Sequence, residues 1–310
     1  MLGALLRAAP AGAGGPPSAQ IDELTVTGER PGPGLFHVHR AGSGDLWVFG
    51  TLSPLPDGLE WRSHKIEQLL DHTDRVLVDR GMVVHAPSAA WILLTKRSLF
   101  LAGKNRYLKD LLPAGVYARF AAQRARFGKD DTTWESLRPA VATGMLMGTA
   151  MPKLGLSGKV DVSEDVQKLA RKRHVRIEDF SVLGADDGLR ALKDLTPEVE
   201  TQCVAMALGL LESGLRRQKE RAQAWAVGDM ARLQPSPQGE SLACMNAMEP
   251  SELHRLYDRT QRAWIANLQR LLDGGGVTLA VIDIDLLFGT EGLFEQLRAL
   301  GYTVDVPGAG

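Results

Sequence analysis

Three aspartates stand where predicted β-strands end, and carboxylates at strand ends can hold a cation or act on a substrate. Asp79 ends the apolar run RVLVD, while Asp283 and Asp285 come late in the run VTLAVIDIDL, residues 277–286. Residues two apart on a strand point to the same face, so Asp283 and Asp285 should lie together. If the three carboxylates converge, they either repel one another or bind a cation, with Mg²⁺, Mn²⁺ or Ca²⁺ favoured over Zn²⁺.

The same aspartates also have a purely structural interpretation. Aspartate after a strand often accepts hydrogen bonds from backbone N–H groups of the next turn, or pairs with an arginine. Arg80 and Arg259 are both available for such a pair. The sequence leaves both interpretations open, and it predicts no cofactor other than a divalent cation.

Other candidate residues are a serine and a pair of histidines. Ser53 follows a predicted strand and Gly50, but Pro54 comes next, so the chain cannot turn into a helix as a nucleophile elbow requires. A serine nucleophile therefore ranks last. His37 and His39 share one face of the first strand and could bind a metal, although solvated histidines on a strand are the commoner case.

The surrounding sequence predicts the elements that would position these residues. LFHVHR (35–40) and DLWVFG (45–50) form a predicted hairpin, followed by a helix after Ser63 and the strand that ends at Asp79. Helical spacing dominates the middle of the chain, and the strands at 277–286 and 302–306 flank a helix. We expect one α/β domain with a central mixed or mostly parallel sheet, flanking helices and a helical lobe at about 85–150.

Composition narrows the classes of function. The net charge is −1, from 36 Lys+Arg against 37 Asp+Glu, without a basic or acidic block, so nucleic acid is a poor candidate partner. No run reaches the roughly 18 apolar residues of a membrane span. Residues 1–33 are rich in Ala, Gly and Pro and are predicted to be disordered, as a possible signal-peptide remnant, before a domain at 34–307.

The order of several motifs resembles the TraB/GumN family, which includes the Tiki-type proteases. The resemblance covers about residues 34–306. It rests on four segments: LWVFGTLSPLPDGLEWRSHKIEQLLDHTDRVLVD, WAVGDMARL, DRTQRAW and LAVIDIDLLFGTEGLFEQLRALGYTVDV. The resemblance implies that two half-domains bring the N-terminal and C-terminal motifs together.

The resemblance also implies a metal site, from which this chain departs. The family's Gly-x-x-His motif reads Gly50-Thr51-Leu52-Ser53 here, and a second motif histidine is replaced by Asp285. Both imidazole ligands of a protease-type site are therefore missing, and a serine hydroxyl is a poor substitute. Only a site rich in oxygen ligands, built from Asp79, Asp283 and Asp285, could remain.

Three functions follow as hypotheses. The first is a non-catalytic binding or scaffolding protein of the cell envelope with a degenerate metal site and an unknown protein or peptide partner. The second is a divalent-cation-dependent hydrolase, and the third is a serine hydrolase at Ser53. Whether the chain is an enzyme stays open, and the candidate catalytic residues are Ser53, Asp79, Asp285 and Arg259.

The resemblance extends to binding residues and to location. It implies that substrate or partner would contact Gly50, Thr51, Ser53, Arg80 and Arg259. Family members are commonly exported, which favours a periplasmic protein over a cytoplasmic one and favours a disulfide between Cys203 and Cys244. The sequence gives no oligomeric state.

Overall fold

The structure is a computed structural model of the 310-residue chain. It describes residues 32–79, 91–92, 94–128, 132–180, 184–233, 252–289 and 292–307, and every structural statement below concerns these. Nearly all of the predicted disordered segment 1–33 lies outside the described residues, as do Arg80 and Cys244.

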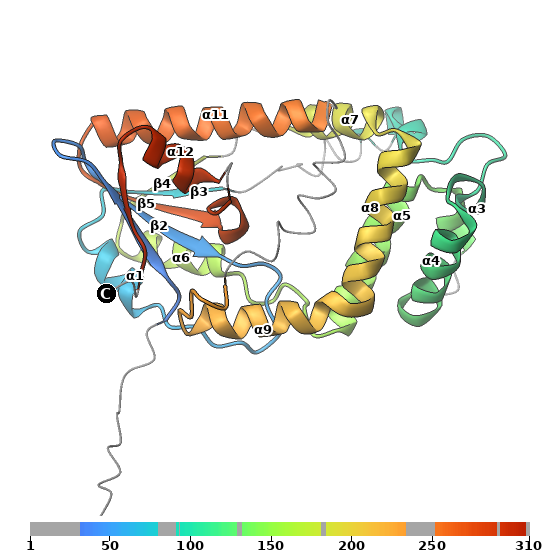
Figure 1. The fold of residues 1–310 in the computed structure, drawn as a ribbon, viewed down its shortest axis with the longest axis horizontal. Helices are drawn as coiled ribbons and strands as arrows, with labels where there is room; N and C mark the ends of the chain where they lie inside the picture. Colours follow the sequence, from blue (N-terminus) through green and yellow to red (C-terminus); the bar gives the residue numbers. More distant parts are fainter. Residues whose placement is uncertain are drawn as a thin grey trace, which may run out of the picture. The chain divides into compact units, whose positions relative to one another are not determined.

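A mixed sheet forms the centre of the fold (Figure 1). Within the described residues its six strands are β1 (Leu35–His39), β2 (Asp45–Thr51), β3 (Arg75–Val78), β4 (Arg176–Asp179), β5 (Val277–Asp283) and β6 (Thr303–Asp305). They lie in the order β4-β3-β5-β2-β1-β6. The first four in this order are parallel to one another, and β1 is antiparallel to both of its neighbours. The prediction of an α/β fold with a mixed, mostly parallel sheet is confirmed.

Apolar side chains explain why β5 and β2 occupy the middle. All five inner residues of β5 are buried, which is typical of a parallel strand covered on both faces. β2 pairs with β5 in register from Asp45 opposite Val277 to Thr51 opposite Asp283. The N-terminal and C-terminal motifs are thereby neighbours in the sheet, as expected.

Helices cover the sheet on both sides. Figure 1 shows α11 (Glu252–Asp273) and α12 (Leu293–Ala299) along one side, and α1 (His64–Leu70), α6 (Val162–Lys172) and α9 (Leu215–Ala226) along the other. The packing agrees with this arrangement, since Phe36 of β1 contacts Phe294 of α12, whereas Phe49 of β2 contacts Trp225 of α9. Among the described residues, no helix has the length and apolar character needed to cross a lipid bilayer.

The helical middle of the chain has a hydrophobic core of its own. It is built from α3 (Leu108–Leu111), α4 (Ala114–Phe127), α5 (Pro139–Lys153) and α8 (Pro197–Gly209), with Phe120, Leu146 and Leu208 fully buried. The remaining elements are α7 (Ala185–Asp194), the short turns η1 (Arg97–Leu99), η2 (Thr132–Ser136) and η4 (Ile284–Leu286), and η3 (Leu210–Gly214), a turn of π-helix between α8 and α9.

Gly50 provides a test of how tightly β2 packs against the turn after β5. A Cβ atom at this position would lie 3.1 Å from Ile284 Cγ1 and 3.2 Å from Leu287 Cδ1. We therefore predict that Gly50→Ala lowers the free energy of unfolding by about 1–3 kcal/mol, measured by urea denaturation.

The matched control is Gly144→Ala in α5, where a Cβ atom would meet nothing within 4 Å. This control should raise the free energy of unfolding by about 0.5–1 kcal/mol, because alanine favours the helix. Equal effects of the two substitutions would show that Gly50 is not closely packed.

Candidate functional site

The carboxyl ends of the parallel strands carry the residues that the sequence singled out. Thr51 at the end of β2 lies opposite Asp283 at the end of β5. Asp79 directly follows β3, and its backbone N–H donates to the carbonyl oxygen of Val281 at 3.4 Å. The strand ends near Gly50, Asp79 and Asp283 therefore meet at one edge of the sheet, where open α/β sheets bind their ligands.

Asp283 shapes the turn that follows β5. Its Oδ1 accepts a hydrogen bond from the backbone N–H of Asp285 at 2.9 Å, and the chain enters the 3₁₀ turn η4 at Ile284. Asp285 therefore does not lie on the strand, and the expectation that Asp283 and Asp285 share one face of the same strand is wrong. The reason is the local competition of the Asp283 carboxylate for a backbone donor, which ends the strand.

Asp285 is paired with an arginine that the sequence analysis did not consider. Arg221 of α9 donates from both terminal nitrogens to the two oxygens of Asp285, with Nη1 3.3 Å from Oδ2. The Arg221 side chain is 15% exposed and that of Asp285 38%. Such a bidentate contact is the strongest geometry for an arginine and a carboxylate. The positive charge of Arg221 balances the negative charge of Asp285 without a metal.

Arg221 belongs to a row of side chains on one face of α9. Gln218 Nε2 donates to the carbonyl oxygen of Pro54 at 2.9 Å, and Trp225 Nε1 donates to that of Gly50 at 2.7 Å. The spacing 218, 221 and 225 places all three on the same helix face. One helix face thus holds both the loop after β2 and the turn after β5. The spacing places Arg221 on this face but does not identify Asp285 as its partner.

The carboxyl groups at this edge act on one another electrostatically. The pKa of Asp283 is raised to about 6, mainly by burial. The charges of Asp285 and Asp79 act in the same direction, whereas the hydrogen bond from the Asp285 N–H and the charge of Arg221 oppose the rise. A carboxylic acid with a raised pKa at a strand end is a recognised mark of a functional site.

The predicted serine site receives no support from its surroundings. Ser53 is exposed, and no described side chain hydrogen-bonds to its hydroxyl. The neighbouring Thr51 hydroxyl donates to the carbonyl oxygen of Ile282 at 3.2 Å. A nucleophilic serine needs a base within hydrogen-bond reach, and the described residues place none there.

The other predicted site residues lie elsewhere or outside the described part of the chain. Arg259 on α11 is half exposed, and its Nη2 lies 4.0 Å from Oδ1 of Asp187 in α7. It does not supply the partner of Asp285. Arg80 is not among the described residues, and since Cys244 is not either, the disulfide with Cys203 stays a prediction.

The metal ligands implied by the family resemblance do not fit this edge. Ser53 offers an exposed hydroxyl in place of one imidazole, and Asp285 is already bound by Arg221. The donor set is therefore not that of a protease-type site with imidazole ligands.

The raised pKa of Asp283 gives a testable dependence on pH. Its native pKa of about 6 lies above the ordinary value of 3.8, so the native state holds the extra proton. The associated stability is complete below about pH 4 and is lost as pH rises through about 6. We predict that Asp283→Asn, which cannot titrate, raises the free energy of unfolding at pH 7.5 by on the order of 2 kcal/mol but not at pH 4.

A control with the opposite sign is Asp57→Asn. Hydrogen bonds from the Ser157 hydroxyl and N–H lower the pKa of Asp57, so this variant should lose more stability at neutral than at acid pH. Urea denaturation at both pH values measures each effect. An Asp283→Asn variant with the same pH dependence as the parent would show that Asp283 does not titrate near pH 6.

Comparison with known proteins gives a family but no individual relative. No curated protein and no solved structure matches the chain. The model of the TraB/PrgY/gumN family matches residues 34–306, which confirms the resemblance inferred from the motifs at both ends of the chain. The match spans nearly all of the sequence, including both motifs that β2 and β5 bring together. This chain is a member of the TraB/PrgY/gumN family.

Proposed function

We propose that this chain is a non-catalytic binding or scaffolding protein of the cell envelope, whose family-type metal site has been replaced by an internal ion pair. The observation that carries the proposal is the contact of Arg221 with both carboxylate oxygens of Asp285. A guanidinium stays charged at all physiological pH values, so it supplies the positive charge that a cation would otherwise bring.

A cation would have to compete with this arginine. To bind Asp285 it must displace the largely buried Arg221 side chain, which would then be left without its carboxylate. Removing one partner from a buried charge pair is costly, because the remaining charge stays desolvated. The ion pair therefore favours a permanently neutralised edge over an exchangeable metal.

The edge is suited to recognition because α9 holds it in one conformation. Gln218 and Trp225 fix the backbone on either side of Thr51 and Ser53, and Ser53 remains exposed. A fixed strand end with an exposed hydroxyl at Ser53 offers a hydrogen-bonding group to a protein or peptide partner. The contribution of Arg80 and Arg259 to such binding remains part of the proposal.

A second candidate is a hydrolase that uses a divalent cation. It is favoured by the raised pKa of Asp283, to which both Asp79 and Asp285 contribute. Mg²⁺, Mn²⁺ or Ca²⁺ would offset the charges of Asp79 and Asp285 that raise the pKa of Asp283. This candidate requires that the cation bind despite Arg221.

Cation binding separates the two candidates. We predict that Mg²⁺, Mn²⁺ and Ca²⁺ cause no thermal stabilisation of the full chain that depends on Asp285, and that unstructured peptides are not hydrolysed. In Arg221→Met, stability without cation should fall by about 1–3 kcal/mol, because Asp285 loses its partner. Added Ca²⁺ should then restore part of this loss, since a cation at 100 times its Kd contributes about 2.7 kcal/mol.

The matched control is Arg221→Met combined with Asp285→Asn. The double variant should recover stability relative to Arg221→Met and should no longer respond to Ca²⁺. If the parent protein itself is stabilised by a cation or cleaves peptides, and Asp285→Asn abolishes the effect, the second candidate replaces the first.

The proposed location has a separate test in the cysteines. A Cys203–Cys244 disulfide would persist only in an oxidising compartment. In protein exported to the periplasm of a bacterial host and then unfolded without reductant, we predict that neither thiol reacts with a maleimide until reductant is added. Cys244→Ser should make Cys203 reactive and, by loss of a loop closure of about 40 residues, cost on the order of 4 kcal/mol. Two reactive thiols in the parent protein would contradict the envelope proposal.

A further inference from the structure

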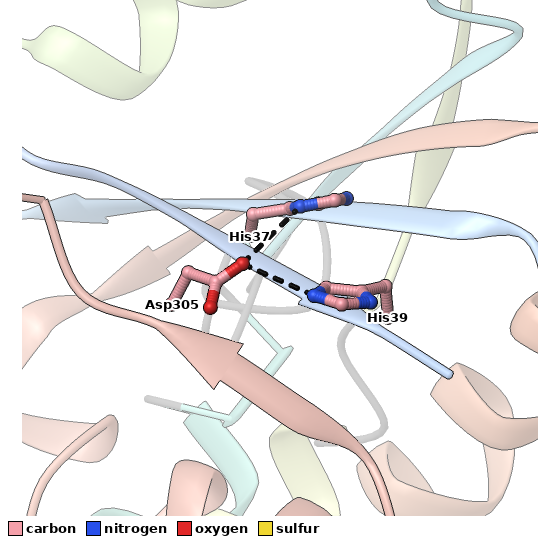
Figure 2. A group of neighbouring side chains, drawn as sticks. All are labelled: His37, His39 and Asp305. Carbon is pink, nitrogen blue, oxygen red and sulfur yellow. Dashed lines mark hydrogen bonds and ion pairs between the residues drawn. The ribbon is translucent and has the colours of Figure 1, made fainter. Parts of the chain in front are cut away.

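A second group of chemically capable side chains lies away from the carboxyl edge described above, where β1 pairs with β6. His37 of β1 lies opposite Asp305 of β6, and His39 follows two residues later on the same face. Figure 2 shows both imidazoles converging on the Asp305 carboxylate. One ligand atom from each residue lies within 4.8 Å of the others.

The hydrogen bond to Asp45 sets which nitrogen of His37 is available. His37 Nε2 lies 2.7 Å from Oδ1 of Asp45. An ionised carboxylate can only accept, so Nε2 carries the hydrogen, and in the neutral ring Nδ1 presents a lone pair. That nitrogen is 3.6 Å from Oδ2 of Asp305. With neutral His37, Nδ1 and Asp305 Oδ2 are two hydrogen-bond acceptors that face each other, and a cation between them would stabilise this arrangement.

Stacking holds the rings in place. The His37 ring stacks on Trp47 with centroids 4.3 Å apart and on His39 with centroids 4.6 Å apart. The backbone ladders of β1 with β2 and with β6 fix the strands that carry these residues. The side chains are therefore ordered without a ligand, which lowers the entropic cost of binding one.

The distances are compatible with a tetrahedral metal ion. Bond lengths near 2.1 Å place neighbouring ligand atoms of tetrahedral zinc roughly 3.3 Å apart. Asp305 Oδ2 lies 3.1 Å from His39 Nε2 and 3.6 Å from His37 Nδ1, values on either side of this spacing. The two imidazole nitrogens lie within 4.8 Å of each other, and this separation would have to shorten when a metal binds.

The chemical types of the three ligands and the hydrogen bond from His37 to Asp45 favour zinc. Two imidazoles and one carboxylate are characteristic zinc ligands, and imidazole distinguishes this group from the oxygen-only set at Asp79, Asp283 and Asp285. A carboxylate that accepts from the far nitrogen of a ligating histidine is the usual support of such sites, and Asp45 is placed to give it. The His39 side chain is 39% exposed, so water can reach a fourth position.

We propose that His37 Nδ1, His39 Nε2 and Asp305 Oδ2 bind one zinc ion, supported by the hydrogen bond from His37 to Asp45. Its effect on the protein follows from the strands that it joins. β6 spans only Thr303–Asp305 and pairs with β1 alone, so it is the least anchored strand of the sheet. A bound zinc ion would fasten this edge strand to β1 and thereby stabilise the end of the fold.

The test is a zinc titration of the full chain, prepared without a histidine tag and stripped with chelator, in competition with a chromophoric zinc indicator. One equivalent should bind with a Kd in the micromolar range or tighter, with a rise in melting temperature. Backbone amides of 303–305 should exchange hydrogen at least tenfold more slowly when zinc is bound. His37→Gln and His39→Gln should each abolish binding of the equivalent, and Asp45→Asn should weaken it about 10–100-fold.

The matched control is His72→Gln, which replaces an exposed histidine outside the group and should leave binding unchanged. Circular dichroism of the zinc-free variants shows that each is folded. If zinc does not bind stoichiometrically, the proposal is overturned. Binding that survives His39→Gln but is lost in Asp285→Asn also overturns it, because the metal then lies at the carboxyl edge.

Discussion

The parallel register of β2 with β5 is the constraint on which the rest of the structure depends. Seven residue pairs, from Asp45 with Val277 to Thr51 with Asp283, join segments more than 200 residues apart in the sequence. The meeting of the two family motifs at the carboxyl edge follows from this pairing. It sets Gly50 against Ile284 and Leu287, and it brings the loop after β2 beside the turn after β5. Without it, neither family motif would meet the other.

Helix α9 converts that pairing into a fixed site. The helix offers a hydrogen-bonding group to each side: Trp225 to Gly50, Gln218 to Pro54 and Arg221 to Asp285. A metal ion with ligands from both motifs would join the same two segments by coordination. In this chain the two segments are joined instead by hydrogen bonds from side chains on one face of α9. The site is therefore held together whether or not a cation is present.

Local patterns were sufficient to predict the strands but not the contacts between their ends. The apolar runs at β3 and β5 and the short loop between β1 and β2 carry their own signals, as does Thr196 as the cap of α8. The helical segment that begins at α8 is interrupted by the π turn at Leu210–Gly214, after which α9 begins. The pairing of Arg221 with Asp285 depends on where α9 then runs, a tertiary property that no local spacing contains. The predicted strand ran to residue 286 because apolar and acidic residues alternate through 282–286. The same alternation is compatible with a short 3₁₀ turn capped by Asp283, which is what the structure has.

The position of β5 between β3 and β2 has a consequence for synthesis on the ribosome. The strands β1, β2, β3 and β4 emerge first, yet β2 and β3 are joined only through β5, which lies between them in the sheet. The sheet therefore cannot close until residues up to 283 have left the exit tunnel. Such long-range pairing makes folding slow, and the open edges of β2 and β3 are meanwhile available for wrong partners. The helical core of α3, α4, α5 and α8 draws its residues from 108–211 and can assemble earlier, so the nascent chain should form this core before its sheet is complete.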